Sequence, residues 1–117
     1  MAPPTDAVTN LPDAANALLD SARTAPAGRA GATLTPGAGV PLTQTLLALT
    51  AGQSLADHES PAAATLQVLI GDVRLTGGDE AVELGAGDHV AIPPQRHGLL
   101  ARADAVVLLT VAAGQGI

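Results

Sequence analysis

The stretch LQVLIGDVRLTGGDEAVELGAGDHVAIPPQRH, residues 66–97, decides the fold of this 117-residue chain. Apolar and polar residues alternate along it in short runs, and glycine or proline separates each run from the next. Alternation with a period of two is typical of β-strands that bury one face. Val73 and Leu75 therefore share a face, with Arg74 on the opposite one. The runs follow one another too closely for intervening helices, which favours an antiparallel sandwich or barrel over βαβ units.

The same spacing extends outward from this stretch and predicts seven strands. They are expected at residues 42–50, 65–70, 72–76, 80–84, 88–92, 97–102 and 105–112. Val90 and Ile92 share a buried face in this scheme, and His89 opposite them lies on an outer surface or at a subunit contact. Gly77 and Gly78 between two strands predict a hairpin turn with positive φ.

The N-terminal part of the chain differs in composition from the rest. Asn10 is a suitable N-cap for a short helix over residues 11–22, whose apolar residues form one narrow stripe. A helix of about 12 residues is marginal alone in water. We therefore expect it to pack outside the sheet or on a partner subunit rather than close the barrel mouth as a lid. The run at 24–41, rich in Gly, Pro and Ala, is a linker or an irregular edge strand. The expected organisation is an arm, helix and connector over 1–41 and a barrel over 42–117.

Composition excludes several classes of function. The chain has no Cys, Trp, Tyr or Phe, so it has no disulfide, no thiol nucleophile and none of the usual stacking platforms for bases and sugars. A net charge of -6 with only five basic residues gives no basic footprint for nucleic acid. The first residues lack the pattern of a signal peptide, and no apolar run reaches the roughly 18 residues of a membrane span. We expect a cytoplasmic protein without a nucleic-acid or membrane partner.

Two glycine-framed segments carry a family resemblance. They are G-QSLAD-HES-PAA-A-TLQVLI-G at 52–71 and G-DHVAI-PPQ-R-H-GLL-A at 87–101. Their order of residues resembles the two motifs of the cupin superfamily, and the resemblance covers roughly residues 42–112. It implies an all-β fold, a double-stranded β-helix or RmlC-like jelly-roll barrel, here with one short N-terminal helix. Related single-domain cupins often pair through their sheets, and alanine supplies almost half of the apolar residues, so we expect a homodimer.

The resemblance also implies where a metal site would lie. In the family, two His and a Glu from the first motif and a His from the second hold a divalent metal inside the barrel. Carried across, His58 fills the first place and His97 the fourth. Ser60 stands where the second His belongs, and Ala64 stands where the Glu belongs. The loop before His97 is one residue shorter than the pattern and lacks its Gly. Two of the four ligands are therefore retained.

Neighbouring carboxylates offer little compensation. Asp57 and Glu59 flank His58 in an extended segment, so alternation points both away from the barrel interior unless a bulge intervenes. Gln67 has the wrong parity if Ala64 faces inward.

Two hypotheses of different classes remain. In the first, the chain is a degenerate cupin, metal-free or weakly metal-binding, that binds a small organic ligand through His58, Ser60 and His97 or serves a sensing or structural role. In the second, it is a metal-dependent dioxygenase or isomerase in which His58 and His97 hold Fe, Mn, Ni or Zn. The missing His and Glu favour the first, and no catalytic residue is assigned.

Overall fold

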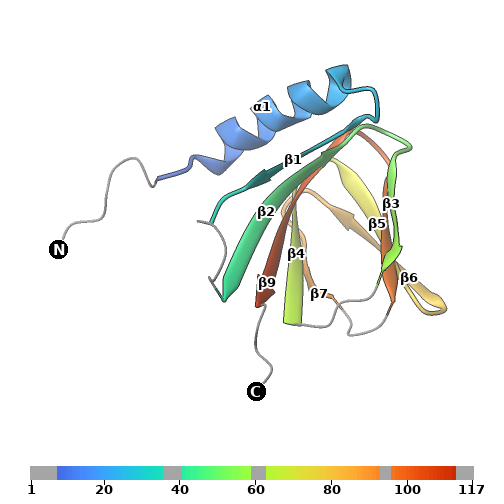
Figure 1. Ribbon diagram of the computed structural model, residues 1–117. Coiled ribbons are helices and arrows are strands. Elements are labelled where there is room, and N and C mark those ends of the chain that lie inside the picture. Colours follow the sequence, from blue (N-terminus) through green and yellow to red (C-terminus); the bar gives the residue numbers. More distant parts are fainter. Residues whose placement is uncertain (1–7, 36–40, 59–62, 93–95, 113–117) are drawn as a thin grey trace.

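The chain folds into two antiparallel sheets that face each other, with one helix outside them (Figure 1). The computed structural model describes residues 8–35, 41–58, 63–92 and 96–112, and for residues 56–58 it describes the backbone only. The elements are α1 (Leu11–Thr24), β1 (Arg29–Thr33), β2 (Leu42–Leu49), β3 (Ser54–His58), β4 (Ala63–Ile70), β5 (Asp72–Gly77), β6 (Glu80–Gly85), β7 (His89–Ala91), β8 (His97–Ala101) and β9 (Ala105–Ala112). No helix in these ranges has both the length and the apolar character needed to cross a membrane.

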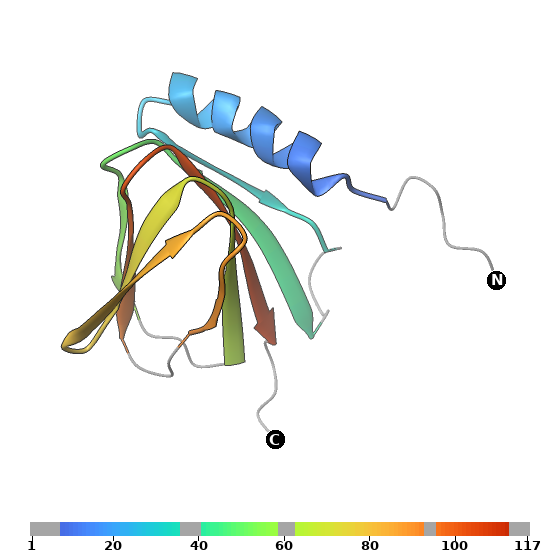
Figure 2. The same ribbon diagram turned by 180° about the vertical axis from the view of Figure 1, so that it is seen from behind.

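The strand order is that of a jelly roll. One sheet has the order β1-β2-β9-β4-β7 and the other β3-β8-β5-β6. Strands far apart in sequence pair at the centre of each sheet, such as β2 with β9, from Leu42 opposite Ala112 to Leu49 opposite Ala105. Figure 2 shows the two sheets enclosing a common interior when seen from behind. The expected all-β class, a jelly-roll barrel with one N-terminal helix, is confirmed.

All seven strands expected from the alternation are present, with ends that differ by two residues or fewer. Two further strands border the barrel. β1 lies in the Gly/Ala-rich run and pairs with β2, from Arg29 opposite Leu49 to Thr33 opposite Thr45, which confirms an edge strand over a linker. β3 was missing from the predicted set. Its sequence, SLADH, has Leu55 as its one bulky apolar residue and so gives almost no alternation.

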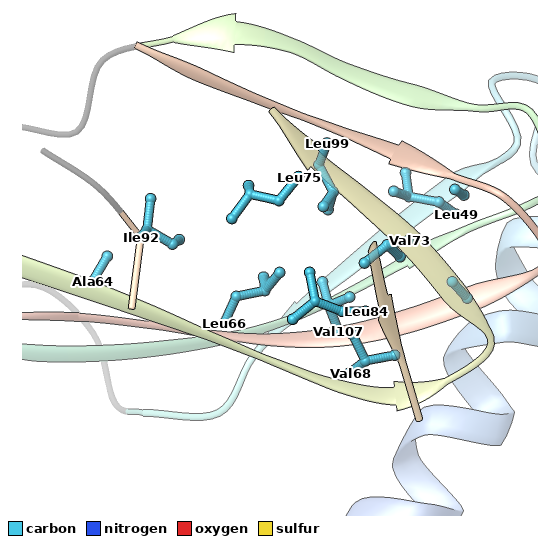
Figure 3. Packing of buried hydrophobic residues seen from close by; sticks show 12 residues of the cluster. Leu49, Ala64, Leu66, Val68, Val73, Leu75, Leu84, Ile92, Leu99 and Val107 are labelled. Carbon is cyan, nitrogen blue, oxygen red and sulfur yellow. The ribbon is translucent and has the colours of Figure 1, made fainter. Parts of the chain in front are cut away.

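The interior between the sheets is aliphatic. Figure 3 shows side chains from both sheets pointing into this space. The buried cluster consists of Leu49, Ala64, Leu66, Val68, Val73, Leu75, Leu84, Ile92, Leu99, Ala101, Ala105 and Val107. The face predictions hold for Val73 and Leu75 inside and Arg74 outside. Val82 lies opposite Leu75 yet is 44% exposed, because its strand β6 pairs only with β5 in the described part of the chain.

Helix α1 covers the outer face of the five-stranded sheet, as Figures 1 and 2 both show. Asn10 caps it as predicted, since its Oδ1 accepts a hydrogen bond of 2.9 Å from the amide of Asp13. The helix runs to Thr24, two residues beyond the expected end, and the capping Ala25 is extended. The helix and sheet bury a second cluster, formed by Ala15, Leu19, Ala22, Leu46, Ala48, Val106 and Leu108. Packing outside the sheet is thus confirmed for the helix, and it does not close the barrel.

Candidate functional site

His97 is the buried polar side chain of the described interior. It begins β8 and is 6% exposed. Alternation along β8 gives it the same face as Leu99 and Ala101, both of which belong to the interior cluster. The side chain of His97 already interacts with another group of the protein. A buried imidazole on the inner face of a barrel is chemically able to donate or accept one hydrogen bond toward a bound molecule.

The strand register brings two of the expected site residues together. His97 lies between two neighbouring strands, opposite His58 of β3 on one side and Gly77 of β5 on the other. The backbones of His58 and His97 are therefore adjacent, although they are far apart in sequence. The side chain of His58 and the whole of Ser60 lie outside the described residues. Of the expected ligand set, the structure thus places His97 completely and His58 by its backbone.

Strand β3 contains an irregularity that the sequence did not reveal. Leu55 lies opposite Leu99 and His58 lies opposite His97. An advance of three positions along β3 therefore corresponds to an advance of two positions along β8. A bulge of this kind reverses the alternation beyond it. The prediction that Asp57 points away from the interior was made for an extended segment without a bulge, and the side chain of Asp57 lies outside the described residues, as does the whole of Glu59. A five-residue strand with one apolar side chain carries no sequence signal that would have revealed the shift.

Ala64 occupies the position at which the cupin motif has its carboxylate. It is 8% exposed and belongs to the aliphatic cluster. Ile92 lies beside it, with the amide of Ile92 donating to the carbonyl of Ala64 at 2.9 Å (Figure 3). Ala64 faces inward, so Gln67, three residues later, lies on the other face, as its parity predicted. A buried methyl group cannot ligate a metal.

The residues that the structure describes do not fit the four-ligand metal centre of the cupin motif. Among them, no three His, Asp or Glu side chains are grouped closely enough to hold a metal ion. Asp88, which follows Gly87, instead forms a turn, and its Oδ2 accepts a hydrogen bond of 2.9 Å from the amide of Gly85. His89 is exposed on β7, as predicted for the outer surface. Glu83 faces solvent and pairs with Arg102 at 2.9 Å.

A pocket lies at one side of the barrel, near the end of β5 where Gly77 pairs with His97, and we call it the seam pocket. It has a volume of about 260 Å³ and is lined by Leu75, Gly77, Glu80, Ala81, Val82, Val90 and Ala91. It forms because β6 and β7 are the edge strands of the two sheets. Gly77, one of the lining residues, lies opposite His97 in the strand register, so His97 is a cross-strand neighbour of the pocket lining. The hairpin turn predicted at Gly77 and Gly78 has its positive φ at Gly78 (60°).

Comparison of the sequence with family models and with curated proteins gives no match. Solved structures do match. A conserved protein of unknown function from Streptococcus pyogenes is 26% identical, with a TM-score of 0.68 over 75% of this chain and 76% of that one. A cupin-2 domain protein from Shewanella frigidimarina is 15% identical, with a TM-score of 0.69 over 90% of this chain and 94% of that one.

An enzyme is also among the similar structures. The salicylate 1,2-dioxygenase from Pseudaminobacter salicylatoxidans is 20% identical, with a TM-score of 0.72 over 86% of this chain and 33% of that enzyme. Of these three proteins, only the dioxygenase has a name that states a reaction. Because one scaffold hosts many chemistries, the likeness gives the fold and leaves the reaction to the residues of the site.

Proposed function

We propose that this chain, a small cupin-domain protein by its fold, is a barrel that binds a small organic ligand without a metal. The observation that carries the proposal is Ala64. The position that supplies the carboxylate in the cupin motif is buried among aliphatic side chains. Two imidazoles alone, those of His58 and His97, would leave a first-row metal mostly surrounded by water, and such a site has little selectivity or strength.

The seam pocket suggests the chemistry of the ligand. Its walls are aliphatic, with Leu75, Val82 and Val90 as the larger contributors and Glu80 as the charged one. Its volume of about 260 Å³ is just below the range of about 300 to 1,000 Å³ that is usual for ligand pockets. The chain has no Phe, Tyr or Trp ring to stack against a planar ligand. We therefore propose a small aliphatic molecule with one polar group that reaches toward His97.

One observation favours the metal-dependent alternative. His58 and His97 occupy facing positions on β3 and β8, where two ligands of a metal would be expected. In that alternative His58 and His97 would hold Fe, Mn, Ni or Zn, and substrate or water would complete the metal's coordination for a dioxygenase or isomerase reaction. Metal content distinguishes the two candidates directly.

The first test is elemental analysis of protein purified without chelator. The parent is compared with the His58→Ala, His97→Ala variant and with a Ser60→His, Ala64→Glu variant that restores the four-ligand pattern. We expect less than stoichiometric metal in the parent and a gain in the restored variant. A full equivalent of metal in the parent, lost when both histidines are removed, would contradict the proposal and favour the enzyme.

The second test locates the ligand. A set of small acids, alcohols and amides is screened by ligand-observed NMR in the presence of EDTA. We expect binding that persists with EDTA and is lost in Val82→Glu, which places a charge in the seam pocket. Ala17→Glu, on the exposed side of α1, is the matched control and should bind as the parent does. Binding that needs added metal, or a screen in which no hit is lost in Val82→Glu, would refute the assignment.

A further inference from the structure

A second groove lies on the flank of the barrel, between β1 and β2 on one side and β3 on the other, and we call it the flank groove. It has a volume of about 380 Å³. Its lining residues are Ala27, Arg29, Ala30, Gly31, Leu47, Ala48, Leu49 and Leu55. In the described part of the chain β1 pairs only with β2 and β3 only with β8, so the two sheets part along this side (Figure 1).

Gly31 keeps the flank groove open. It lies opposite Leu47 in the β1–β2 register, and Leu47 packs at the margin of the interior cluster. A Cβ at position 31 would lie 3.4 Å from Cδ2 of Leu47, which is ordinary contact. A methyl group here would therefore fit without forcing the backbone apart, and a larger side chain would extend over Leu47 and fill the groove. The apolar floor is exposed because an edge strand carries a glycine at this position.

The single charged residue of the flank groove is Arg29. Arg23 pairs with Asp104 at 3.0 Å, and Arg102 pairs with Glu83. Arg29 forms no ion pair with any residue in the described ranges, and its Nη1 makes one long hydrogen bond, 3.4 Å, to the carbonyl of Ser54. That bond holds the guanidinium across the groove, from β1 toward β3. A guanidinium without a carboxylate partner, beside aliphatic walls, is complementary to an anion that carries an aliphatic chain.

We propose that the flank groove binds an aliphatic monocarboxylate, with its carboxylate on Arg29 and its chain over Leu47 and Leu55. This site is separate from the ligand site of the proposed function. Ser54 and Leu55 lie opposite Leu100 and Leu99, whereas His97 lies opposite the other end of β3. The absence of aromatic residues favours a saturated chain over a ring as the apolar part.

The test uses the full ¹⁵N-labelled chain and three probes, because the protein has no tryptophan or tyrosine to report binding by fluorescence. Octanoate, kept below its micelle concentration, carries both the charge and the chain. Octanol carries the chain alone, and acetate the charge alone.

We expect octanoate to shift the amide resonances around Gly31, Leu47 and Leu55. An exposed ion pair is worth at most about 1 kcal/mol, so octanoate should bind up to about fivefold more tightly than octanol, and less so at high salt. Acetate should cause no saturable shift.

Variants separate the charge from the groove. Arg29→Gln should reduce octanoate affinity to that of octanol, and Arg29→Lys should retain most of it. Gly31→Val should abolish the binding of both probes by filling the groove, and Gly31→Ala serves if the valine variant does not fold. Arg96→Gln is the matched control, because Arg96 is also exposed and without an ion pair in the described ranges, and it should bind octanoate as the parent does.

Three outcomes would overturn the proposal. The first is octanoate affinity that is unchanged in Arg29→Gln. The second is a set of shifts around Gly77 and His97 instead, which would assign the fatty acid to the site of the proposed function. The third is a homodimer that buries Gly31 and becomes monomeric in Gly31→Val, which would make this groove a subunit interface. Loss of the flank site alone leaves the proposed function standing, because the two sites are probed by different variants.

Discussion

Gly71, between β4 and β5, occupies a position at which only glycine fits the backbone. It has a φ of 80°, and a Cβ there would lie 2.1 Å from the carbonyl oxygen of Asp104. Gly71→Ala should therefore lower the free energy of unfolding by about 3 kcal/mol or more, from backbone strain and steric overlap together.

Gly52 is the matched control: its φ is 87°, but no atom lies within 4 Å of a Cβ built there. Gly52→Ala should lose only about 1 kcal/mol. Urea unfolding followed by circular dichroism measures both, and equal losses would contradict the steric argument.

Asp104 joins three parts of the molecule through one carboxylate. Its Oδ1 accepts from the amide of Ala51 at 2.9 Å, and its Oδ2 accepts from Nε of Arg23 at 3.0 Å. Two hydrogen bonds lower the pKa of Asp104 from its ordinary value of 3.8, and the bond from the amide of Ala51 has a larger effect than the bond from Arg23. Helix α1 is thereby attached to the turn before β9 and to the turn after β2.

The lowered pKa of Asp104 predicts a specific dependence of stability on pH. Because the folded pKa is below the unfolded one, the contribution is complete above about pH 4 and disappears as the pH falls through the folded pKa. Asp104→Asn should lower the unfolding temperature at pH 7 by roughly a few degrees, and the difference from the parent should shrink toward pH 3. Thermal unfolding at several pH values tests this. Asp79→Asn, in the exposed turn between β5 and β6, is the control. A difference that persists undiminished at pH 3 would disprove the role of the charge.

At the scale of elements, the cap of α1 offers a test of how far the helix stabilises the sheet beneath it. Asn10→Ala removes the hydrogen bond to the amide of Asp13 and should lower the free energy of unfolding by about 1 kcal/mol. Asn16 is the control within the same helix: its exposed side chain donates only a local bond of 2.9 Å to the carbonyl of Pro12, and the higher helix propensity of Ala offsets the loss of that bond. Asn16→Ala should be neutral or slightly stabilising. A neutral Asn10→Ala would mean that the helix end frays without affecting the barrel.

The strands show which elements a sequence can predict. Strands with two or more large aliphatic residues on one face, such as β5 with Val73 and Leu75, were predicted within two residues of their ends. β3 was missed because Leu55 is its one bulky apolar residue, so its extended conformation depends on pairing with β8, which is distant in sequence. Edge strands receive ladder bonds on one side only and bury less, and their sequences therefore carry a weaker signal.

The candidate site was predictable only in part, for a similar reason. The glycine framework and the position of His97 followed from the sequence, because turns and motif spacing are local. The parity of Ala64 also followed from alternation along β4. The bulge beside His58 and the seam pocket did not, since both depend on how edge strands of different sheets are placed. Sequence spacing thus identified the candidate site residues, whereas their surroundings in the folded chain depend on tertiary packing.

At the scale of the whole molecule, the amount of buried aliphatic surface bears on assembly. Three of the twelve residues in the interior cluster are alanine, and so are three of the seven residues buried between α1 and the sheet. Alanine removes little apolar area from water on burial. Among the described residues, each sheet also ends in edge strands, β1 and β7 in one and β3 and β6 in the other. A modest core and open strand edges together favour association of two copies, and we therefore propose a homodimer.

The proposed homodimer predicts an unfolding temperature that depends on protein concentration. If folding and association are coupled, the unfolding temperature rises with protein concentration, because a partner that binds only the folded chain stabilises it by mass action. Scanning calorimetry over a hundredfold range of concentration should therefore show a steady rise, and sedimentation equilibrium should give twice the mass of 11.4 kDa. An unfolding temperature independent of concentration, together with a monomer mass, would show that this alanine-rich barrel is sufficiently stable alone.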